Sequence, residues 1–120
     1  IEDLVNEPMV LLDLPLSSNY FLSLFHERGL RPYVAERVSN LSSLRSLVAN
    51  GFGYGLLNIS TKTNLAPDGQ KLVFRQLVGE HRPMVFGLVR KKSDYSSRIV
   101  AAFAEHVSRR VAESGLPGMS

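Results

Sequence analysis

The 120-residue chain contains no cysteine, so it has no disulfide framework and no cysteine nucleophile. This absence fits a cytoplasmic protein. No apolar run approaches the ~18 residues that a membrane-spanning helix needs, and the early run Met9–Leu12 is too short for the hydrophobic part of a signal peptide. The chain also lacks an initiator methionine, so we expect it to be a piece of a longer polypeptide.

The chain lacks the residue combinations of catalytic and metal sites as well. Its three histidines, His26, His81 and His106, are far apart in the sequence, and none stands at metal-ligand spacing with a carboxylate or another histidine. No Gly-x-Ser-x-Gly motif is present. We therefore expect no enzymatic activity, no catalytic residue, no metal ion and no cofactor.

Positive charge is only slightly in excess. The net charge is +3 and the basic residues are spread along most of the chain, which does not by itself indicate a nucleic-acid partner. The densest basic patch, Arg90–Lys92, is interpreted as the solvated end of a strand.

Three glycines, Gly51, Gly53 and Gly55, resemble part of a dinucleotide-binding fingerprint. That fingerprint follows a strand and opens a helix. Here the glycines close a helix and open a strand, so no helix N-terminus faces a phosphate. We interpret them as a turn.

The clearest structural pattern lies in the segment from Ser39 to Asn58. Apolar residues recur there at helical spacing and predict one buried face; they are Leu41, Leu44, Leu47 and Val48. Ser39 or Asn40 is suited to cap the start of this helix, and Gly51 is suited to end it. A short apolar strand over 55–59 is expected to follow.

The rest of the chain alternates between strand and helix patterns. Before this segment, the pattern predicts a buried strand, a helix and a second strand, over 9–12, 18–28 and 33–38. After it, the pattern predicts two strands and a helix, over 71–77, 84–89 and 93–115, with Ser93 or Asp94 as the cap of that helix. Short β-α-β connections favour parallel pairing. The predicted fold class is α/β, an open, mostly parallel sheet flanked by helices.

Ligands of open α/β sheets bind beyond the carboxyl ends of the strands. The richest such end here is the segment from Asp13 to Tyr20. Ser17 or Ser18 is expected to cap the next helix, and together with its free N–H groups could form a cradle for a small carboxylate. Plain helix capping explains these serines equally well. Asp13 is at least as well explained by bonding the following turn as by general-base chemistry.

Four stretches share their order and spacing with a known family. They are E-P-M-V-L-L-D-L-P-L-S-S-N-Y-F, V-S-N-L-S-S-L-R-S-L-V-A-N-G-F-G-Y-G-L-L-N, D-G-Q-K-L-V-F-R-Q-L and I-V-A-A-F-A-E. From about Leu4 to Val111, the chain resembles the C-terminal effector-binding domain of LysR-type transcriptional regulators. The helix–glycine–strand unit is the most specific part, and the pattern Asp-x-Pro-x-Ser-x-x-Tyr supports it.

The resemblance implies one lobe of a periplasmic-binding-protein type 2-like domain. Residues 1–92 would form the second lobe, 93–115 a helix returning toward the first lobe, and 116–120 a tail. The full-length protein would be a dimer or tetramer that binds DNA through an N-terminal helix-turn-helix domain, which this chain does not contain.

The resemblance also implies site residues. A small-molecule effector would bind in the cleft between the lobes, and the matching positions are Asp13, Pro15, Ser17, Ser18, Tyr20 and Tyr54. The serines and Tyr20 would meet polar or anionic groups, with Pro15 and Tyr54 shaping the wall. The dimer interface would use the exposed face of the first predicted helix and the edge strand, at Tyr33, Ala35 and Arg37.

Two readings therefore stay open. The chain is either the ligand-sensing lobe of a transcription regulator or a lobe of a solute-binding transport protein or enzyme on the same fold, since fold does not settle function. The upstream sequence would discriminate them: a helix-turn-helix supports the first reading and a signal peptide the second.

Overall fold

This computed structural model describes residues 1–92 and 97–115. The secondary-structure elements are η1 (Glu2–Leu4), β1 (Met9–Leu12), α1 (Ser17–His26), β2 (Val34–Val38), α2 (Leu41–Ala49) and α3 (Arg98–Ser114). Internal contacts divide the chain into two units. The first holds residues 1–57 and 61–83, and the second holds residues 58–60 and the described residues from 84 onward.

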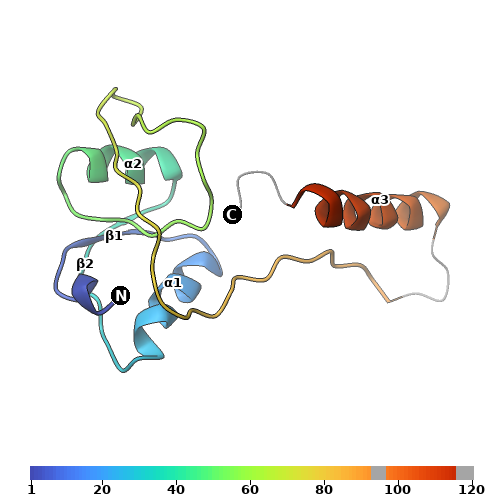
Figure 1. Ribbon diagram of the computed structural model, residues 1–120, viewed down its shortest axis with the longest axis horizontal. Helices are drawn as coiled ribbons and strands as arrows, with labels where there is room; N and C mark the ends of the chain where they lie inside the picture. Colours follow the sequence, from blue (N-terminus) through green and yellow to red (C-terminus); the bar gives the residue numbers. More distant parts are fainter. Residues whose placement is uncertain (93–96, 116–120) are drawn as a thin grey trace. The chain divides into compact units, whose positions relative to one another are not determined.

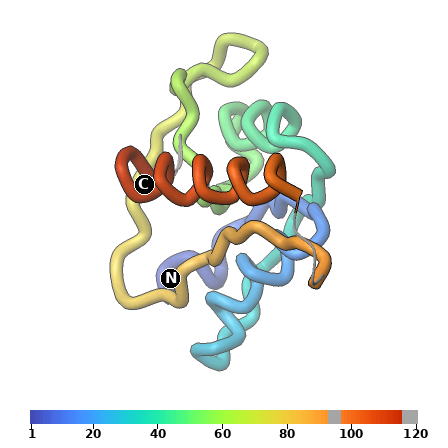
Figure 2. The backbone as a smooth tube through the Cα atoms, turned by 90° about the vertical axis from the view of Figure 1, so that its right-hand side faces the viewer, coloured from blue at the N-terminus to red at the C-terminus, as the bar shows by residue number. Residues whose placement is uncertain are grey.

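Strand β1 is buried on both faces, as its uninterrupted apolar sequence predicts. Because side chains alternate along a strand, Met9 and Leu11 pack against α1, whereas Val10 and Leu12 pack on the side of α2. The two helices lie on opposite sides of the strand pair in both views (Figures 1 and 2). The α/β architecture predicted from the sequence is confirmed.

Strands β1 and β2 pair in parallel, and their register is irregular at one step. Met9 pairs with Val34, but the next residue of β1, Val10, pairs with Glu36. Residue Ala35 is therefore extra, in the manner of a β-bulge. The bulge shifts the alternation of β2 by one residue, so that Arg37 lies on the same side of the sheet as Val34.

Helix α2 has the ends that its sequence predicts. The Asn40 side chain caps the helix by accepting a hydrogen bond of 2.8 Å from the Ser43 N–H. Gly51 follows the helix with a φ of +84°, a conformation that favours glycine. Arg45 is buried and donates to the carbonyl oxygens of Thr63 and Leu65 at 2.8 and 2.6 Å. This arginine clamp fastens the 63–65 loop to α2.

Two of the predicted strands in the first unit are reduced to single bridges. In place of a strand over 55–59, Tyr54 forms one parallel bridge with Met9, and the Tyr54 carbonyl accepts a hydrogen bond of 2.8 Å from the Val10 N–H. In place of a strand over 71–77, Lys71 forms one antiparallel bridge with Leu65. Within the described residues, neither segment has a longer strand edge to pair with. The predicted lengths of these two strands are therefore wrong.

The predicted strand over 84–89 is also wrong, and the difference is larger. This segment, in the second unit, forms no strand, and Val85 and Val89 are 86% and 98% exposed. A strand needs a neighbouring edge to satisfy its backbone N–H and C=O groups. Within the described residues this segment pairs with no such edge.

Helix α3 begins at a serine, but not at a predicted one. The Ser97 hydroxyl accepts from the Val100 N–H at 3.3 Å, and Gly115 ends the helix with a φ of +66°. The predicted caps Ser93 and Asp94 lie outside the described residues, as does the tail. None of the α3 residues is buried. In residues 1–92 and 97–115, every helix is too short or too polar to cross a membrane.

Candidate functional site

The candidate site is the turn between the carboxyl end of β1 and the start of α1. Asp13 continues the pairing of β1, because its N–H donates to the Val38 carbonyl at 2.8 Å. Its side chain forms an ion pair of 3.2 Å with Arg37 of β2. Both side chains are about half exposed, so the pair is worth only about 0–1 kcal/mol. The structure thus gives Asp13 a bonding partner in the sheet.

The residue that starts α1 is Leu16, which has no side-chain acceptor for a cap. The prediction that Ser17 or Ser18 caps the helix is wrong, since both lie inside its first turn. Leu16 has a φ of +70° and its side chain is 83% exposed. A bulky residue in this conformation stores about 1–3 kcal/mol of strain. Local sequence preference therefore does not account for the conformation of this turn.

The two serines have different roles in this turn. The buried Ser18 hydroxyl donates to the Leu14 carbonyl at 3.1 Å, and the Ser18 N–H donates to the same carbonyl at 3.2 Å. Ser18 therefore stabilises the turn itself. Ser17 is only partly buried, and neither its hydroxyl nor its N–H donates to another group in the described part of the chain. Ser17 is the serine that stays available to a ligand.

Tyr20 faces away from the turn. Its hydroxyl donates to the Arg82 carbonyl at 2.9 Å, and its ring meets the edge of Phe21 with centroids 5.4 Å apart. The same outer side of α1 holds the Arg82 side chain, which donates to the Ser23 hydroxyl at 3.2 Å and pairs with Glu27 at 3.5 Å. Tyr20 thus connects α1 to the segment around residue 82.

Tyr54 lies at the other end of β1. Its backbone pairs with Met9, the first residue of the strand, and its hydroxyl donates to the Leu4 carbonyl at 3.2 Å. Burial raises the pKa of Tyr54 to about 12, and the negative charge of Glu7 adds to this shift. Because Asp13 follows the last residue of β1, the structure does not bring Tyr54 to the turn.

The three residues expected at the dimer interface do not share one face of β2. Leu11 pairs with Arg37 and Met9 with Val34, so the bulge at Ala35 puts Arg37 on the α1 side, together with Val34. Tyr33 is exposed and Ala35 is half-buried. Strict alternation would place Arg37 on the same face as Tyr33 and Ala35, and the irregular register of β2 moves it to the other face.

No metal centre is found in residues 1–92 and 97–115: their histidines and carboxylates form no group of three or more that could hold an ion. The functional features that the sequence did not indicate are the backbone conformation of Leu16 and the partners of Asp13, Ser18 and Tyr20. The aspartate and tyrosine partners, Arg37 and Arg82, stand 24 and 62 positions away, and no local pattern connects them.

The comparison with family models decides the identity of the domain. Residues 1–112 match the LysR substrate binding domain. The chain belongs to the LysR family. The LysR substrate-binding domain has the periplasmic-binding-protein type 2-like fold, in agreement with the parallel sheet and flanking helices described above.

Solved structures of LysR-family regulators resemble this LysR domain. Two are LysR family transcriptional regulators from Pseudomonas aeruginosa, the PA01 protein and HinK. Each is 41% identical over 59% of this chain, with a TM-score of 0.58. A third, the C-terminal domain of a LysR family regulator from Rhodococcus sp. RHA1, is 36% identical over 58% of the chain, with a TM-score of 0.56. No curated protein matches the chain.

The LysR chain is short beside these relatives. It spans 25% and 24% of the two Pseudomonas chains and 34% of the Rhodococcus chain. The similarity therefore covers a domain, and the activity and partners of a whole regulator are not established by it.

Proposed function

We propose that this chain is the effector-sensing part of a LysR-family transcriptional regulator, and that it binds a small carboxylate at the turn before α1. Effector binding would bias two arrangements of the oligomer, and the DNA contacts of the full-length protein would follow. The observation that carries this proposal is the exposed, strained turn at Leu16, which leaves Ser17 without a protein partner in the described residues.

The chemistry of the turn suits a small anion. The first turn of a helix presents N–H groups and the positive end of the helix dipole, which together favour a carboxylate. The N–H of Ser17 and the N–H of Asn19 make no hydrogen bond within the described residues, whereas those of Ser18 and Tyr20 donate to turn carbonyls. In this arrangement Ser17 binds the ligand and Ser18 holds the turn.

The other proposed site residues act around this contact. The exposed Pro15 would form part of the wall, and Asp13 would keep Arg37 in place through their ion pair. Tyr20 would transmit a shift of α1 to the segment around Arg82 through its hydrogen bond. Tyr54 is left out of the carboxylate contact, because its hydroxyl already donates to Leu4 at the other end of the strand.

Assembly is proposed to use the edge strand. β2 pairs with β1 on one side, and a free edge carries N–H and C=O groups that a second chain can pair with. A homo-oligomer, a dimer or tetramer of the full-length regulator, would place Tyr33, Ala35 and Arg37 near the contact. The proposal further assigns the protein to the cytoplasm and gives it no enzymatic activity. The transport-protein alternative is not favoured, since the solved relatives are transcription regulators.

Calorimetric titration of the complete effector-binding domain with acetate, succinate and malate tests the site. Ser17→Ala should weaken the affinity for the binding carboxylate about tenfold, because a hydrogen bond to a charged group is lost. The matched control is Ser42→Ala, which removes an exposed serine hydroxyl from the first turn of α2. Equal affinity in wild type and Ser17→Ala would contradict the site. If the affinity of the full-length protein for DNA did not change when a carboxylate binds, the sensing role would be contradicted.

A further inference from the structure

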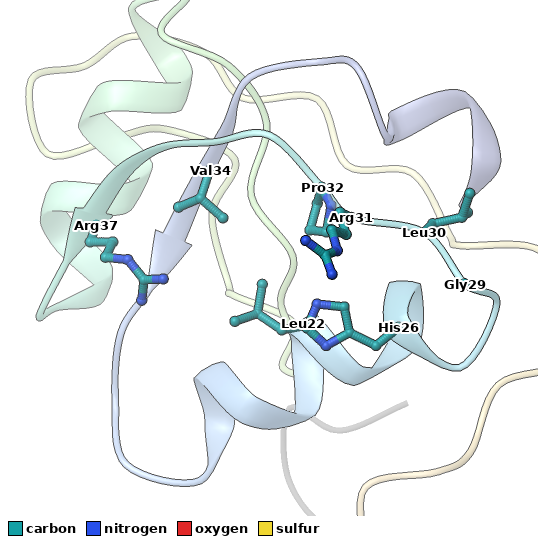
Figure 3. A pocket seen from close by; sticks show the side chains of 8 residues that line it. All are labelled: Leu22, His26, Gly29, Leu30, Arg31, Pro32, Val34 and Arg37. Carbon is teal, nitrogen blue, oxygen red and sulfur yellow. The ribbon is translucent and has the colours of Figure 1, made fainter.

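A second candidate site is a hollow of about 650 Å³ between α1 and β2. Figure 3 shows the eight side chains that surround it. They are Leu22, His26, Gly29, Leu30, Arg31, Pro32, Val34 and Arg37. Its volume falls within the roughly 300–1,000 Å³ of small-molecule sites.

The bulge in β2 brings the first cation into this hollow. A regular strand starting from Val34 would turn Arg37 to the opposite face, toward α2. The extra residue at Ala35 reverses this, so that Arg37 pairs with Leu11 and lies on the α1 side. Bulges commonly redirect a side chain in this way beside functional sites.

The end of α1 supplies the other two ionisable side chains. Leu22 and His26 are four residues apart and therefore occupy one face of the helix. Gly29, with a φ of +70°, reverses the chain, and the Leu30 N–H donates to the Phe25 carbonyl at 3.0 Å. After this reversal, Arg31 and His26 both line the hollow (Figure 3).

The charge of the hollow is not balanced by its own lining. None of the eight lining residues is acidic. Arg37 pairs with Asp13, but neither Arg31 nor His26 forms an ion pair within the described residues. An anion bound in the hollow would pair with Arg31, the lining cation that has no acidic partner in the described residues.

The rest of the lining is apolar. Leu22, Leu30, Pro32 and Val34 are each partly buried and line the hollow between the charged groups. We propose that this hollow binds a small organic anion with an apolar body, an aromatic carboxylate in its simplest form. The carboxylate pairs with Arg31, which can hold it through two parallel hydrogen bonds. The ring lies against the apolar side chains, and Asp13 remains with Arg37.

The proposed contact, Arg31, follows the C-terminal end of α1, whereas Ser17 lies at its start, so this site does not rest on the proposed sensing role. The probe is benzoate, titrated calorimetrically into the 120-residue chain, with benzamide as the uncharged analogue of the same shape. Benzoate should bind saturably and benzamide at least about tenfold more weakly, since the pairing of opposite charges is lost.

The variant that tests the hollow is Arg31→Gln. It should weaken benzoate binding about tenfold or more, whereas Lys62→Gln, which removes the same charge from another exposed position, should have no effect. Arg31 is exposed and bonds no other residue in the described part of the chain, so thermal unfolding of Arg31→Gln should match the wild type and confirm that it folds.

Three results would overturn the proposal. Benzoate binding could be absent, or the two charge-removing variants could weaken it equally, which would indicate unspecific attraction to a basic surface. Sedimentation could instead show that Arg31→Gln dissociates an oligomer while benzoate has no effect. The hollow would then hold an acidic side chain of a second copy, and the small-anion assignment would be wrong.

Discussion

Two uninterrupted apolar runs of this chain lie in opposite environments. Met9–Leu12 is a strand whose residues are at most 9% exposed, whereas Met84–Val89 forms no strand and exposes two valines almost completely. The difference lies in the neighbours. The first run has β2 beside it and a helix on each side, and the second has no such partners in the described residues. An apolar run is therefore buried only where neighbouring strands and helices cover it.

Leucine truncation should separate the two runs most strongly. Leu11→Ala removes a buried side chain from the α1 side of the sheet and should lower the free energy of unfolding by about 2–5 kcal/mol. Leu88→Ala makes the same change at an exposed leucine and should change it by less than about 0.5 kcal/mol. Urea denaturation followed by circular dichroism measures both. Equal losses would mean that the second run is buried after all.

Glycine substitution should give the next largest contrast. Gly53 has a φ of +141°, and an added Cβ would collide with the Pro8 carbonyl oxygen, which accepts the adjacent Tyr54 N–H. Gly53→Ala should destabilise the first unit by roughly 2 kcal/mol or more. Gly87 has open space around it, so Gly87→Ala should be neutral within about 0.5 kcal/mol. Thermal unfolding curves of both variants test this, and a neutral Gly53→Ala would contradict the tight approach to Pro8.

Removal of the helix caps should give the smallest contrast. Asn40→Ala removes the cap of α2, which packs on the core of the first unit, and should cost about 1 kcal/mol in the free energy of unfolding. Ser97→Ala removes the cap of α3, in which no residue is buried. That change should fray the first turn of α3 and leave the unfolding of the first unit unaltered. Hydrogen exchange at Ser43 and Val100, the two capped amides, distinguishes these outcomes.

The parts of the fold that sequence reasoning predicted are those determined by nearby residues. The burial of Met9–Leu12 follows from its uninterrupted apolar run between prolines. The ends of α2 follow from Asn40 and Gly51, which act within one turn of the chain. Parallel pairing of the first two strands follows from the helix between them. In each case the physical cause lies within a few residues of the effect or in a single chain connection.

The parts that sequence reasoning missed depend on the whole fold. Serines near Leu16 look like caps, but the backbone enters the helix at Leu16 with a positive φ, a conformation that leucine does not favour and that the sequence therefore does not signal. Alternation in β2 fails at Ala35 because the register with β1 is irregular there. Of the candidate site, the sequence could therefore locate the turn but not which of its groups were already bonded.

The clamp formed by Arg45 does not depend on any titrating acid. A guanidinium keeps its proton at every physiological pH, and the groups that accept its hydrogen bonds here are backbone carbonyls, which do not titrate. Arg28 and Arg82 on the α1 side combine an ion pair with hydrogen bonds to neutral groups, since Arg28 also donates to the Leu24 and Glu80 carbonyls and Arg82 to the Ser23 hydroxyl. The attachment of the 63–65 loop to α2 therefore rests on a permanent charge and on neutral acceptors, with no carboxylate involved.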